Sequence, residues 1–265
     1  MHKALTIAAS DSGGACGIQA DIKTFSALGV YAASVITAVT AQNSVGMSAA
    51  LDIPTDLVLE QTRQVLKDIQ PTAIKMGMIG AADNYRILAE LFQTQKTGLL
   101  VLDPVVCCYR NCPWVLNDAA ITTLKQHMLP LVDILALSIP DAEVMLKQPI
   151  TTVAQMSDAT KKLHAFGPRF VLLKGGHLDD EPVDILYDGQ NLHEYTSKRI
   201  NTTHDNGSGC VFSSAIAAYL AQGAAIPEAV KNARAFMTSV LPHGKPVGKG
   251  HGPVQVFYHL WRKWK

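Results

Sequence analysis

The sequence predicts an α/β fold in which a mostly parallel central sheet carries helices on both faces. Two observations support this prediction. Short apolar runs rich in β-branched residues alternate with stretches whose apolar residues recur every three or four positions, which are the patterns of buried strands and of surface helices. No linker, repeat or low-complexity tract divides the 265 residues. We therefore expect one domain, residues 1–265, with the sheet as its middle layer.

The elements follow in order along the chain. Buried parallel strands are expected at residues 5–8, 34–39, 73–76, 99–102, 134–137 and 170–173. Helices are expected at residues 18–28, 54–69, 84–95, 118–127 and 156–166. Apolar residues recur there at helical spacing, as in the series Leu57, Val65, Ile69 and Ile87, Leu88, Leu91. Residues 184–186 and 192–195, joined across Asp188-Gly189, are typical of an antiparallel edge hairpin. The apolar stretches 211–222 and 226–240 close the core.

Composition favours a soluble, folded protein. Of the residues, 48% are hydrophobic and 17% are charged, which argues against disorder. A formal net charge of +1 gives no reason to expect nucleic acid or an anionic membrane as a partner, so any anion site must be local. The N-terminus lacks a secretory pattern, no apolar run is long enough for a membrane span, and five cysteines fit a reducing compartment. We therefore expect a cytoplasmic protein.

Residues 205–210, Asp-Asn-Gly-Ser-Gly-Cys, form the most informative motif. Gly207 and Gly209 around Ser208 let successive backbone N–H groups turn toward one point, at which the N-terminus of the following helix is also aimed. Such a point can hold an anion. Cys210 lies where the loop becomes the helix, and the positive potential there favours a thiolate that can act as base or nucleophile. Phosphoryl transfer needs both parts, although a glycine-rich turn that merely caps a buried helix would look the same.

Other polar and glycine-containing segments lie directly after expected strands, where open α/β sheets bind ligands. They include Gln42-Asn43, Gly77-Met78, Asp103-Pro104-Val105 and Lys174-Gly175-Gly176. Together with residues 5–25, 205–210 and 250–254, these segments closely resemble the hydroxymethylpyrimidine/phosphomethylpyrimidine kinases of thiamine synthesis, members of the ribokinase-like superfamily. The resemblance runs in order from about residue 4 to residue 257, without large insertions.

The resemblance implies a ribokinase-like three-layer sandwich that uses ATP and Mg²⁺. The implied reaction is phosphorylation of 4-amino-5-hydroxymethyl-2-methylpyrimidine and of its monophosphate, in a protein that commonly forms homodimers. Cys210 would be the acceptor-side base, in an anion hole built from Gly207, Ser208 and Gly209. The implied pyrimidine pocket lies at Ala9, Asp21, Gln42, Met78 and Val105. The implied nucleotide contacts are Lys174 and Lys249, with Asp141 as the carboxylate on the magnesium side.

The sequence departs from the family pattern around the phosphates and the metal. The family's Thr-His-Gly-Thr-Gly-Cys is Asp-Asn-Gly-Ser-Gly-Cys here, so Asn206 replaces histidine. Its Asn-x-x-Glu element aligns with Ser138-Ile139-Pro140-Asp141, and Glu143 could substitute only if its helix turns it inward. Its Ser-Gly-Gly-Ala-Gly has become Gly13-Gly14-Ala15-Cys16-Gly17, and Arg110-Asn111-Cys112 replaces Ser-Gly-Asp. We interpret Cys16 as a small packing residue.

Two other functions stay open at this point. A pyridoxine or pyridoxal kinase would act on a similarly sized hydroxymethyl heteroaromatic. A catalytically weak small-molecule binder would explain Ser138 and Asn206. Cys107, Cys108 and Cys112 are close enough in sequence to suggest a metal site, but no second pair stands at finger-like spacing, which favours a loop with adventitious thiols. We expect structural roles for His177 and His251.

Overall fold

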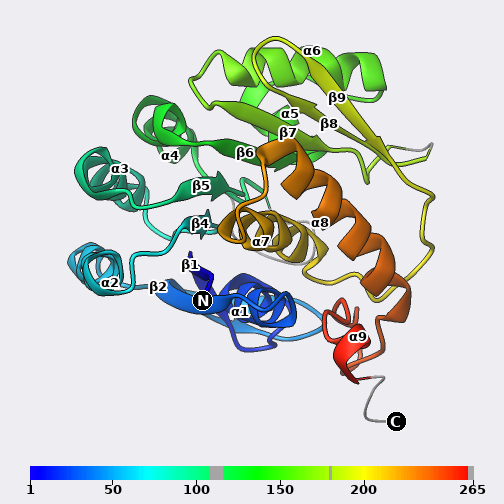
Figure 1. The fold of residues 1–265 in the computed structure, drawn as a ribbon, viewed down its shortest axis with the longest axis horizontal. Helices are drawn as coiled ribbons and strands as arrows, with labels where there is room; N and C mark the ends of the chain where they lie inside the picture. Colours follow the sequence, from blue (N-terminus) through cyan, green and yellow to red (C-terminus); the bar gives the residue numbers. More distant parts are fainter. Residues whose placement is uncertain (108–115, 179–180, 262–265) are drawn as a thin grey trace.

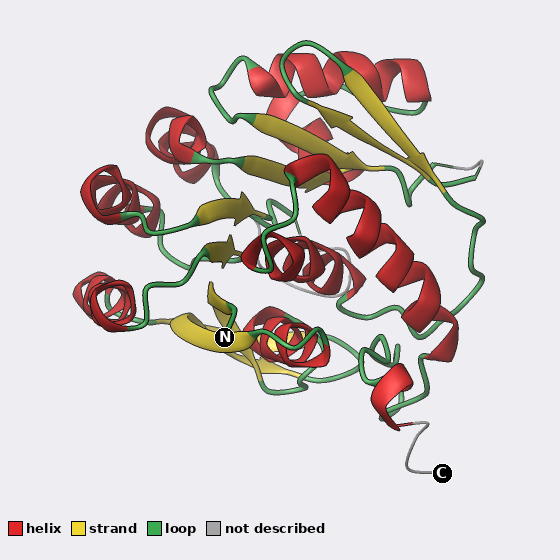
Figure 2. Ribbon diagram, in the orientation of Figure 1, coloured by secondary structure: helices red, strands yellow, loops and turns green. Residues whose placement is uncertain are grey.

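The computed structural model describes residues 1–107, 116–178 and 181–261 (Figure 1). Every strand in these ranges belongs to one sheet with the order β3-β2-β1-β4-β5-β6-β7-β8-β9. The strands are β1 Lys3–Asp11, β2 Tyr31–Gln42, β3 Met47–Asp52, β4 Ala73–Met76, β5 Leu99–Leu102, β6 Ile134–Ser138, β7 Phe170–Lys174, β8 Val183–Tyr187 and β9 Leu192–Thr196. The sheet runs through the middle of the molecule, between two sets of helices (Figure 2).

The six expected parallel strands form the centre of the sheet. Strands β2, β1, β4, β5, β6 and β7 pair in parallel with their neighbours. The expected edge hairpin is confirmed too, because β8 and β9 pair antiparallel and β8 pairs antiparallel with β7. The carboxyl ends of the six central strands therefore meet along one edge of the fold.

The opposite edge of the sheet carries a strand that the sequence did not predict. Strand β3 pairs antiparallel with β2. Five of its six residues are exposed, and Leu51 is 72% exposed, while Met47 is buried. A strand without a buried face shows no alternation of apolar and polar residues, so the sequence pattern does not reveal it. Only its hydrogen-bonded pairing with β2 identifies β3 as a strand. The β2–β3 turn, residues 43–46, reaches the carboxyl-end side of the sheet.

The helices form one layer on each face of the sheet (Figure 1). One layer holds α1 Gly17–Ala27, α7 Ser208–Ala221 and α8 Ile226–Val240, and the other holds α2 Thr55–Asp68, α3 Asp83–Gln95, α4 Asp118–Thr123, α5 Ile139–Leu146 and α6 Val153–His164. Neighbouring residues of a strand face opposite layers. In β4, Ala73 packs against the layer of α1, α7 and α8, whereas Ile74 and Met76 pack against the layer of α2 to α6. The three-layer prediction is thereby confirmed. A short helix, α9 Tyr258–Trp261, follows.

Three helical segments differ from the expectation. The buried residues of α2 are Val58, Thr62 and Leu66, whereas Leu57 is 51% exposed, so the expected apolar stripe was wrong by one position at its start. Helix α5 was not among the ranges expected from apolar spacing, although Glu143 was assigned to a local helix. It begins directly after β6 because the Ser138 side chain caps it, with proline in its first turn. The expected helix at 118–127 is helical, but beyond α4 it continues as a π-helix, Leu124–Met128.

Helix α7 is the buried helix that positions the site. Ten of its fourteen residues are buried, and it lies between the sheet, α1 and α8 (Figure 1). An all-round apolar helix is stable only when it is covered on every side, which these neighbours achieve. No helix in the described part of the chain combines the length and the apolar character needed to cross a membrane.

Candidate active site

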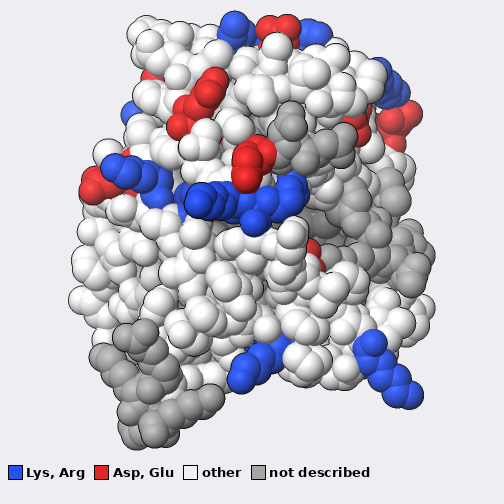
Figure 3. Space-filling view, turned by 90° about the vertical axis from the view of Figure 1, so that its right-hand side faces the viewer, with Lys and Arg blue, Asp and Glu red and all other residues white. Residues whose placement is uncertain are grey.

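A cavity of about 570 Å³ opens at the carboxyl ends of the parallel strands. Its walls come from the β2–β3 turn, the loops after β5, β6 and β7, the first turn of α7, and residues 197–202. The arrows of β4 and β5 point to the right in Figure 2, and Figure 3 looks onto that side. Lys and Arg side chains gather there in a band, although the net charge of the chain is only +1. The lining of the cavity itself includes the basic residues Lys174, Lys198, Arg199 and Arg234, so positive charge lies where anion binding requires it.

The anion loop, residues 205–210, forms the wall from which α7 begins. Gly207 is the N-cap residue with a φ of 78°, and a Cβ there would collide with the carbonyl oxygen of Ala15. The position therefore requires glycine. The Ser208 N–H donates to the carbonyl oxygen of Asp205 at 3.0 Å, which closes the loop. Because the first N–H groups of a helix have no partner within it, α7 presents donors and its positive dipole end at the cavity.

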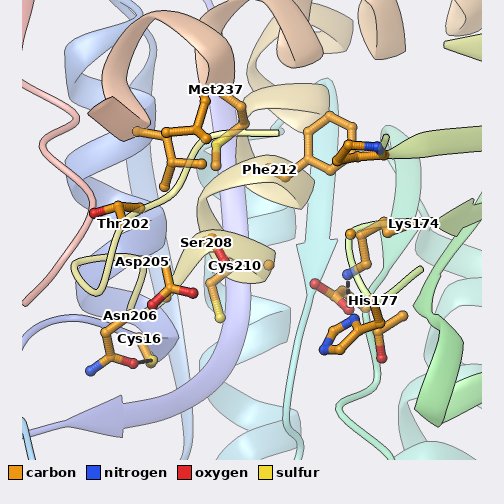
Figure 4. A pocket seen from close by; sticks show the side chains of 18 of the residues that line it. Cys16, Lys174, His177, Thr202, Asp205, Asn206, Ser208, Cys210, Phe212 and Met237 are labelled. Carbon is orange, nitrogen blue, oxygen red and sulfur yellow. Dashed lines mark hydrogen bonds and ion pairs between the residues drawn. The ribbon is translucent and has the colours of Figure 1, made fainter. Parts of the chain in front are cut away.

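Cys210 lies in the first turn of α7 and lines the cavity. A hydrogen bond from Cys16 is the main cause that lowers the pKa of its thiol; burial opposes this change, and the Lys75 ammonium supports it. Figure 4 shows the Cys210 sulfur directed into the space between the anion loop and Cys16. A thiol with a lowered pKa is more often ionised near neutral pH, which is what a base at this point needs.

A buried ion pair joins α1 to β4 behind this turn of α7. Lys75 Nζ lies 2.9 Å from Asp21 Oδ2, and neither side chain is more than 1% exposed. Thr6 Oγ1 and Ser214 Oγ donate to the same carboxylate at 2.5 and 2.6 Å. Burial tends to lower the pKa of Lys75, but the charges of Asp21 and Cys210 outweigh it and raise this pKa. The Asp21 side chain therefore faces Lys75 within the core.

Lys174 lies beside the start of α7, on the other wall of the cavity (Figure 4). Its Nζ lies 3.0 Å from Asp103 Oδ1, and Ser213 Oγ donates to the second oxygen of Asp103 at 2.9 Å. A Cβ at Gly209 would lie only 3.6 Å from Lys174 Nζ. The ammonium and the N-terminus of α7 are thus adjacent positive groups that can share the oxygens of one phosphate.

Two charged residues that the sequence analysis missed fix the loop after Lys174. Asp184 of β8 is 1% exposed and accepts a hydrogen bond from the Gly175 N–H at 2.9 Å. Arg234 of α8 lies 2.8 Å from the same carboxylate, and its guanidinium lies over the ring of Phe212. The only sequence signal was one acidic residue within the otherwise apolar strand β8. The Asp184–Arg234 pair therefore holds the loop after Lys174 against both β8 and α8.

Asp141, the expected magnesium-side carboxylate, lines the cavity but already has several donors. It accepts hydrogen bonds from the hydroxyl and N–H of Ser138 and, at 3.0 Å, from the N–H of Cys107. Glu143 accepts from the Ile150 N–H at 2.7 Å, so it does not substitute for Asp141. Among the described residues, no three His, Cys, Asp or Glu side chains could hold a metal between them. Such a site fits Mg²⁺ only as an ion carried mainly by nucleotide phosphates and water.

The structure brings most of the sequence-predicted residues to one cavity. Its lining includes Gln42, Val105, Asp141, Lys174, Gly207, Ser208, Gly209 and Cys210. Val105 has a φ of 50°, a strained conformation for a β-branched residue and one often found at functional sites. Cys16, which we interpreted as a packing residue, also lines the cavity. That interpretation missed its contact with Asn206 of the anion loop.

Four predicted residues lie outside the cavity lining. Ala9 is buried in β1, and its N–H donates to the Met78 carbonyl oxygen at 2.9 Å. Asp21 is buried against Lys75. Lys249 is exposed, in a segment whose Gly250 N–H donates to the Ser44 hydroxyl.

His177 lines the cavity, and His251 Nδ1 lies 3.4 Å from Asp205 Oδ1 at the anion loop. Cys107 is described, whereas Cys108, Cys112 and the Arg110-Asn111 pair lie outside the described residues.

The chain matches known protein sequences over almost its whole length. A family model described as phosphomethylpyrimidine kinase matches residues 11–255. The hydroxymethylpyrimidine/phosphomethylpyrimidine kinase of Haemophilus influenzae is 39% identical over 259 residues, which cover 96% of each chain. The thiamine biosynthesis bifunctional protein ThiED of Geobacter sulfurreducens is 40% identical over 94% of this chain, and this chain spans about half (51%) of that longer protein.

Solved structures of other proteins share the fold of this chain. The ADP complex of Bacillus subtilis pyridoxal kinase has a TM-score of 0.89 at 32% identity, covering 98% of this chain and 99% of that one. Phosphomethylpyrimidine kinase from Clostridium difficile has a TM-score of 0.79 at 38% identity, covering 90% and 99%. Pyridoxal kinase from Staphylococcus aureus in complex with AMP-PCP and pyridoxal has a TM-score of 0.89 at 30% identity, covering 98% and 94%. These likenesses confirm the ribokinase-like fold.

Proposed function

Because the chain belongs to the phosphomethylpyrimidine kinase family, we propose that it transfers phosphoryl groups from ATP to 4-amino-5-hydroxymethyl-2-methylpyrimidine and then to its monophosphate. The arrangement around α7 supports this proposal most directly. Cys210 and the N-terminus of α7 lie on one wall of the cavity, and Lys174 with Asp103 lies beside them. A proton acceptor, an anion hole and a phosphate-binding cation therefore share one space, as phosphoryl transfer requires.

The proposed mechanism assigns one task to each group. In the first transfer, the Cys210 thiolate takes the proton of the acceptor hydroxyl as its oxygen bonds to the γ-phosphorus of ATP, and the bond from that phosphorus to the bridging oxygen breaks so that ADP leaves. The first N–H groups of α7 and the Lys174 ammonium stabilise the charge on the transferring phosphoryl oxygens. Positioning supplies most of the acceleration, because a loose phosphoryl transition state needs little early deprotonation. Mg²⁺, when bound, neutralises phosphate charge, and Asp141 is the carboxylate that we propose on its side of the cavity.

The reaction can be tested with three acceptors in parallel. The purified chain would be incubated with ATP, Mg²⁺ and either the hydroxymethylpyrimidine, its monophosphate or pyridoxal, and the products resolved by mass. We expect the pyrimidine diphosphate. Phosphorylation of pyridoxal alone would favour the second candidate, which the fold similarity to pyridoxal kinases motivates. Binding of the pyrimidine without any product would instead show a binding protein that has lost efficient transfer.

We propose that Gln42 recognises the pyrimidine by hydrogen bonds to the edge of its ring. Ser12 Oγ bonds both backbone groups of Gln42, at 2.6 and 2.8 Å, and holds this residue at the cavity rim. Its amide can donate and accept, which matches an aminopyrimidine, and Val105 can cover the ring. We expect Gln42→Ala to raise the dissociation constant of the pyrimidine about 3- to 10-fold, the value of one or two neutral hydrogen bonds.

Calorimetric titration would measure this change, with ATP titrated alongside. ATP affinity should stay within about twofold of the wild type, since one or two neutral hydrogen bonds to the pyrimidine are all that the substitution removes. Gln64→Ala, on the outer surface of α2, is the matched control, because that exposed amide bonds Glu60 of its own helix. Equal losses for the pyrimidine and for ATP would argue against the role of Gln42.

Two further features are proposed, the first from the cysteine usage of the chain and the second from the family. We propose that the chain acts in the cytoplasm and that it self-associates as a homodimer. Sedimentation velocity at micromolar concentration tests the second point, and a monomer there would reject it.

A further inference from the structure

Two helices begin at the same corner of the cavity. Helix α1 follows its N-cap residue Cys16, and α7 follows its N-cap residue Gly207. The two loops lie backbone against backbone, since a Cβ on Gly207 would collide with Ala15. Cys16 and Cys210 both line the cavity, and Figure 4 shows their sulfur atoms turned toward the same space. A thiol from each helix N-terminus therefore faces the point where the acceptor hydroxyl would react.

The Cys16 thiol has one hydrogen and two acceptors within reach. Its Sγ lies 3.4 Å from Asn206 Oδ1 (Figure 4). Cys210 is its second partner, and this hydrogen bond is the main cause that lowers the pKa of Cys210. A neutral sulfur accepts weakly, so the amide oxygen holds the hydrogen while Cys210 is protonated. An ionised sulfur accepts strongly, so the hydrogen turns to Cys210 once its proton leaves.

We propose that Cys16 is a positioning residue for phosphoryl transfer, whose S–H donates to the Cys210 thiolate and rests on Asn206 while Cys210 is protonated. The proposal deepens the proposed function, because it rests on Cys210 as the base. It also joins two departures from the family pattern into one unit. Cys16 stands where the pattern has alanine and Asn206 where it has histidine, and these two side chains contact each other.

Several other charges face Cys210 from the surrounding elements. Lys75 of β4 favours the thiolate, whereas Asp21 of α1 and Asp103 after β5 oppose it. Lys174 of β7 lies beside the preceding residue, Gly209. None of these groups changes in the variants below. A difference between those variants therefore reports on Cys16 and Asn206 and not on the electrostatics of the site as a whole.

The test measures the ionisation of Cys210 without any substrate. The wild type, Cys16→Ala and Cys16→Ser would be alkylated with iodoacetamide across pH, and the Cys210 peptide quantified by mass spectrometry. We expect the apparent pKa of Cys210 to rise by about one unit in Cys16→Ala, a roughly 10-fold slower reaction below the pKa. Cys16→Ser keeps a donor and should recover at least half of that shift. An unshifted Cys16→Ala variant, or a serine variant equal to the alanine variant, would overturn the proposal.

Substitution of Asn206 provides a second test of the proposal. Removing its amide takes away an acceptor that competes with Cys210 for the Cys16 hydrogen, so Asn206→Ala should lower the apparent pKa of Cys210. In the Cys16→Ala background the same substitution should have no effect, because Asn206 acts through Cys16. An equal shift in both backgrounds would overturn this coupling. If Cys16→Ala does not fold, Asn206→Ala can be compared with the double variant Asn206→Ala/Cys16→Ser. The serine hydroxyl can still donate to Cys210, so the lowered apparent pKa of Cys210 should persist in the double variant, and its loss would overturn the coupling.

Alkylation separates this proposal from the proposed function. The alkylation experiment needs no substrate. Even if the chain proves inactive as a kinase, it therefore still reports whether the apparent pKa of Cys210 depends on Cys16. In an active chain, the acid limb of the pH profile of kcat should move by the same amount and in the same direction as the alkylation pKa. An acid limb that stays in place while the alkylation pKa moves would leave Cys16 tuning a thiol that is not the base, which contradicts the proposal.

Discussion

Replacing Cys210 by alanine is expected to lower kcat about 100-fold or more, while the dissociation constants of the pyrimidine and of ATP change less than about threefold. The methyl group leaves the backbone of the anion loop intact, so the N–H groups that hold phosphate oxygens remain in place. The substitution removes only the proton acceptor, and general base catalysis contributes about 10²- to 10⁴-fold. The lower end applies here, because a loose transition state needs little deprotonation.

The pH dependence adds a check on the role of Cys210. A base must be deprotonated to act, so the wild-type rate should fall as the pH drops through the lowered pKa of this thiol. This acid limb should be absent from the residual rate of Cys210→Ala. Cys210→Ser, which keeps the size and a hydroxyl, separates acidity from packing and should lose nearly as much. A Cys210→Ala enzyme with kcat within twofold of the wild type would remove Cys210 as the base.

The central fold was predictable because its signals are local. Strand β5 is buried on both faces, so its four successive apolar residues reveal it without knowledge of its neighbours, and in β4 only Lys75 interrupts the same pattern. The anion loop was predictable for a similar reason, since a glycine-rich turn before an apolar helix is a contiguous pattern. We propose, as the sequence led us to expect, that residues 1–265 form one domain.

The residues that sequence analysis misplaced depend on contacts between distant segments. Asp21 was expected to touch the pyrimidine, but its partner Lys75 lies 54 positions away and turns the carboxylate into the core. Cys16 was interpreted as packing, because its contact with Asn206 spans 190 positions. Strand β3 has no buried face, and only its pairing with β2 identifies it. Such features become visible only when α1, β4 and α7 are assembled side by side.

The buried pair beside Cys210 should dominate the stability of this region. Lys75→Met is expected to reduce the free energy of unfolding by about 3–5 kcal/mol, because methionine fills the same space but leaves the Asp21 carboxylate without its cation. The hydroxyls of Thr6 and Ser214 would still donate to that carboxylate, but neither supplies charge. Urea unfolding followed by circular dichroism would measure the change.

Two further variants separate the charge of Lys75 from its volume. Lys147→Met is the matched control, since Lys147 pairs with Asp118 while both side chains are at least 76% exposed, and exposed pairs contribute only about 0–1 kcal/mol. The double variant Lys75→Met/Asp21→Asn removes both charges and should be more stable than Lys75→Met alone, because no unpaired carboxylate remains buried. A Lys75→Met variant no less stable than Lys147→Met would mean that the core solvates Asp21 without its partner. The carboxylate would then depend on Thr6 and Ser214 alone, and Lys75 would matter to Cys210 only through its charge.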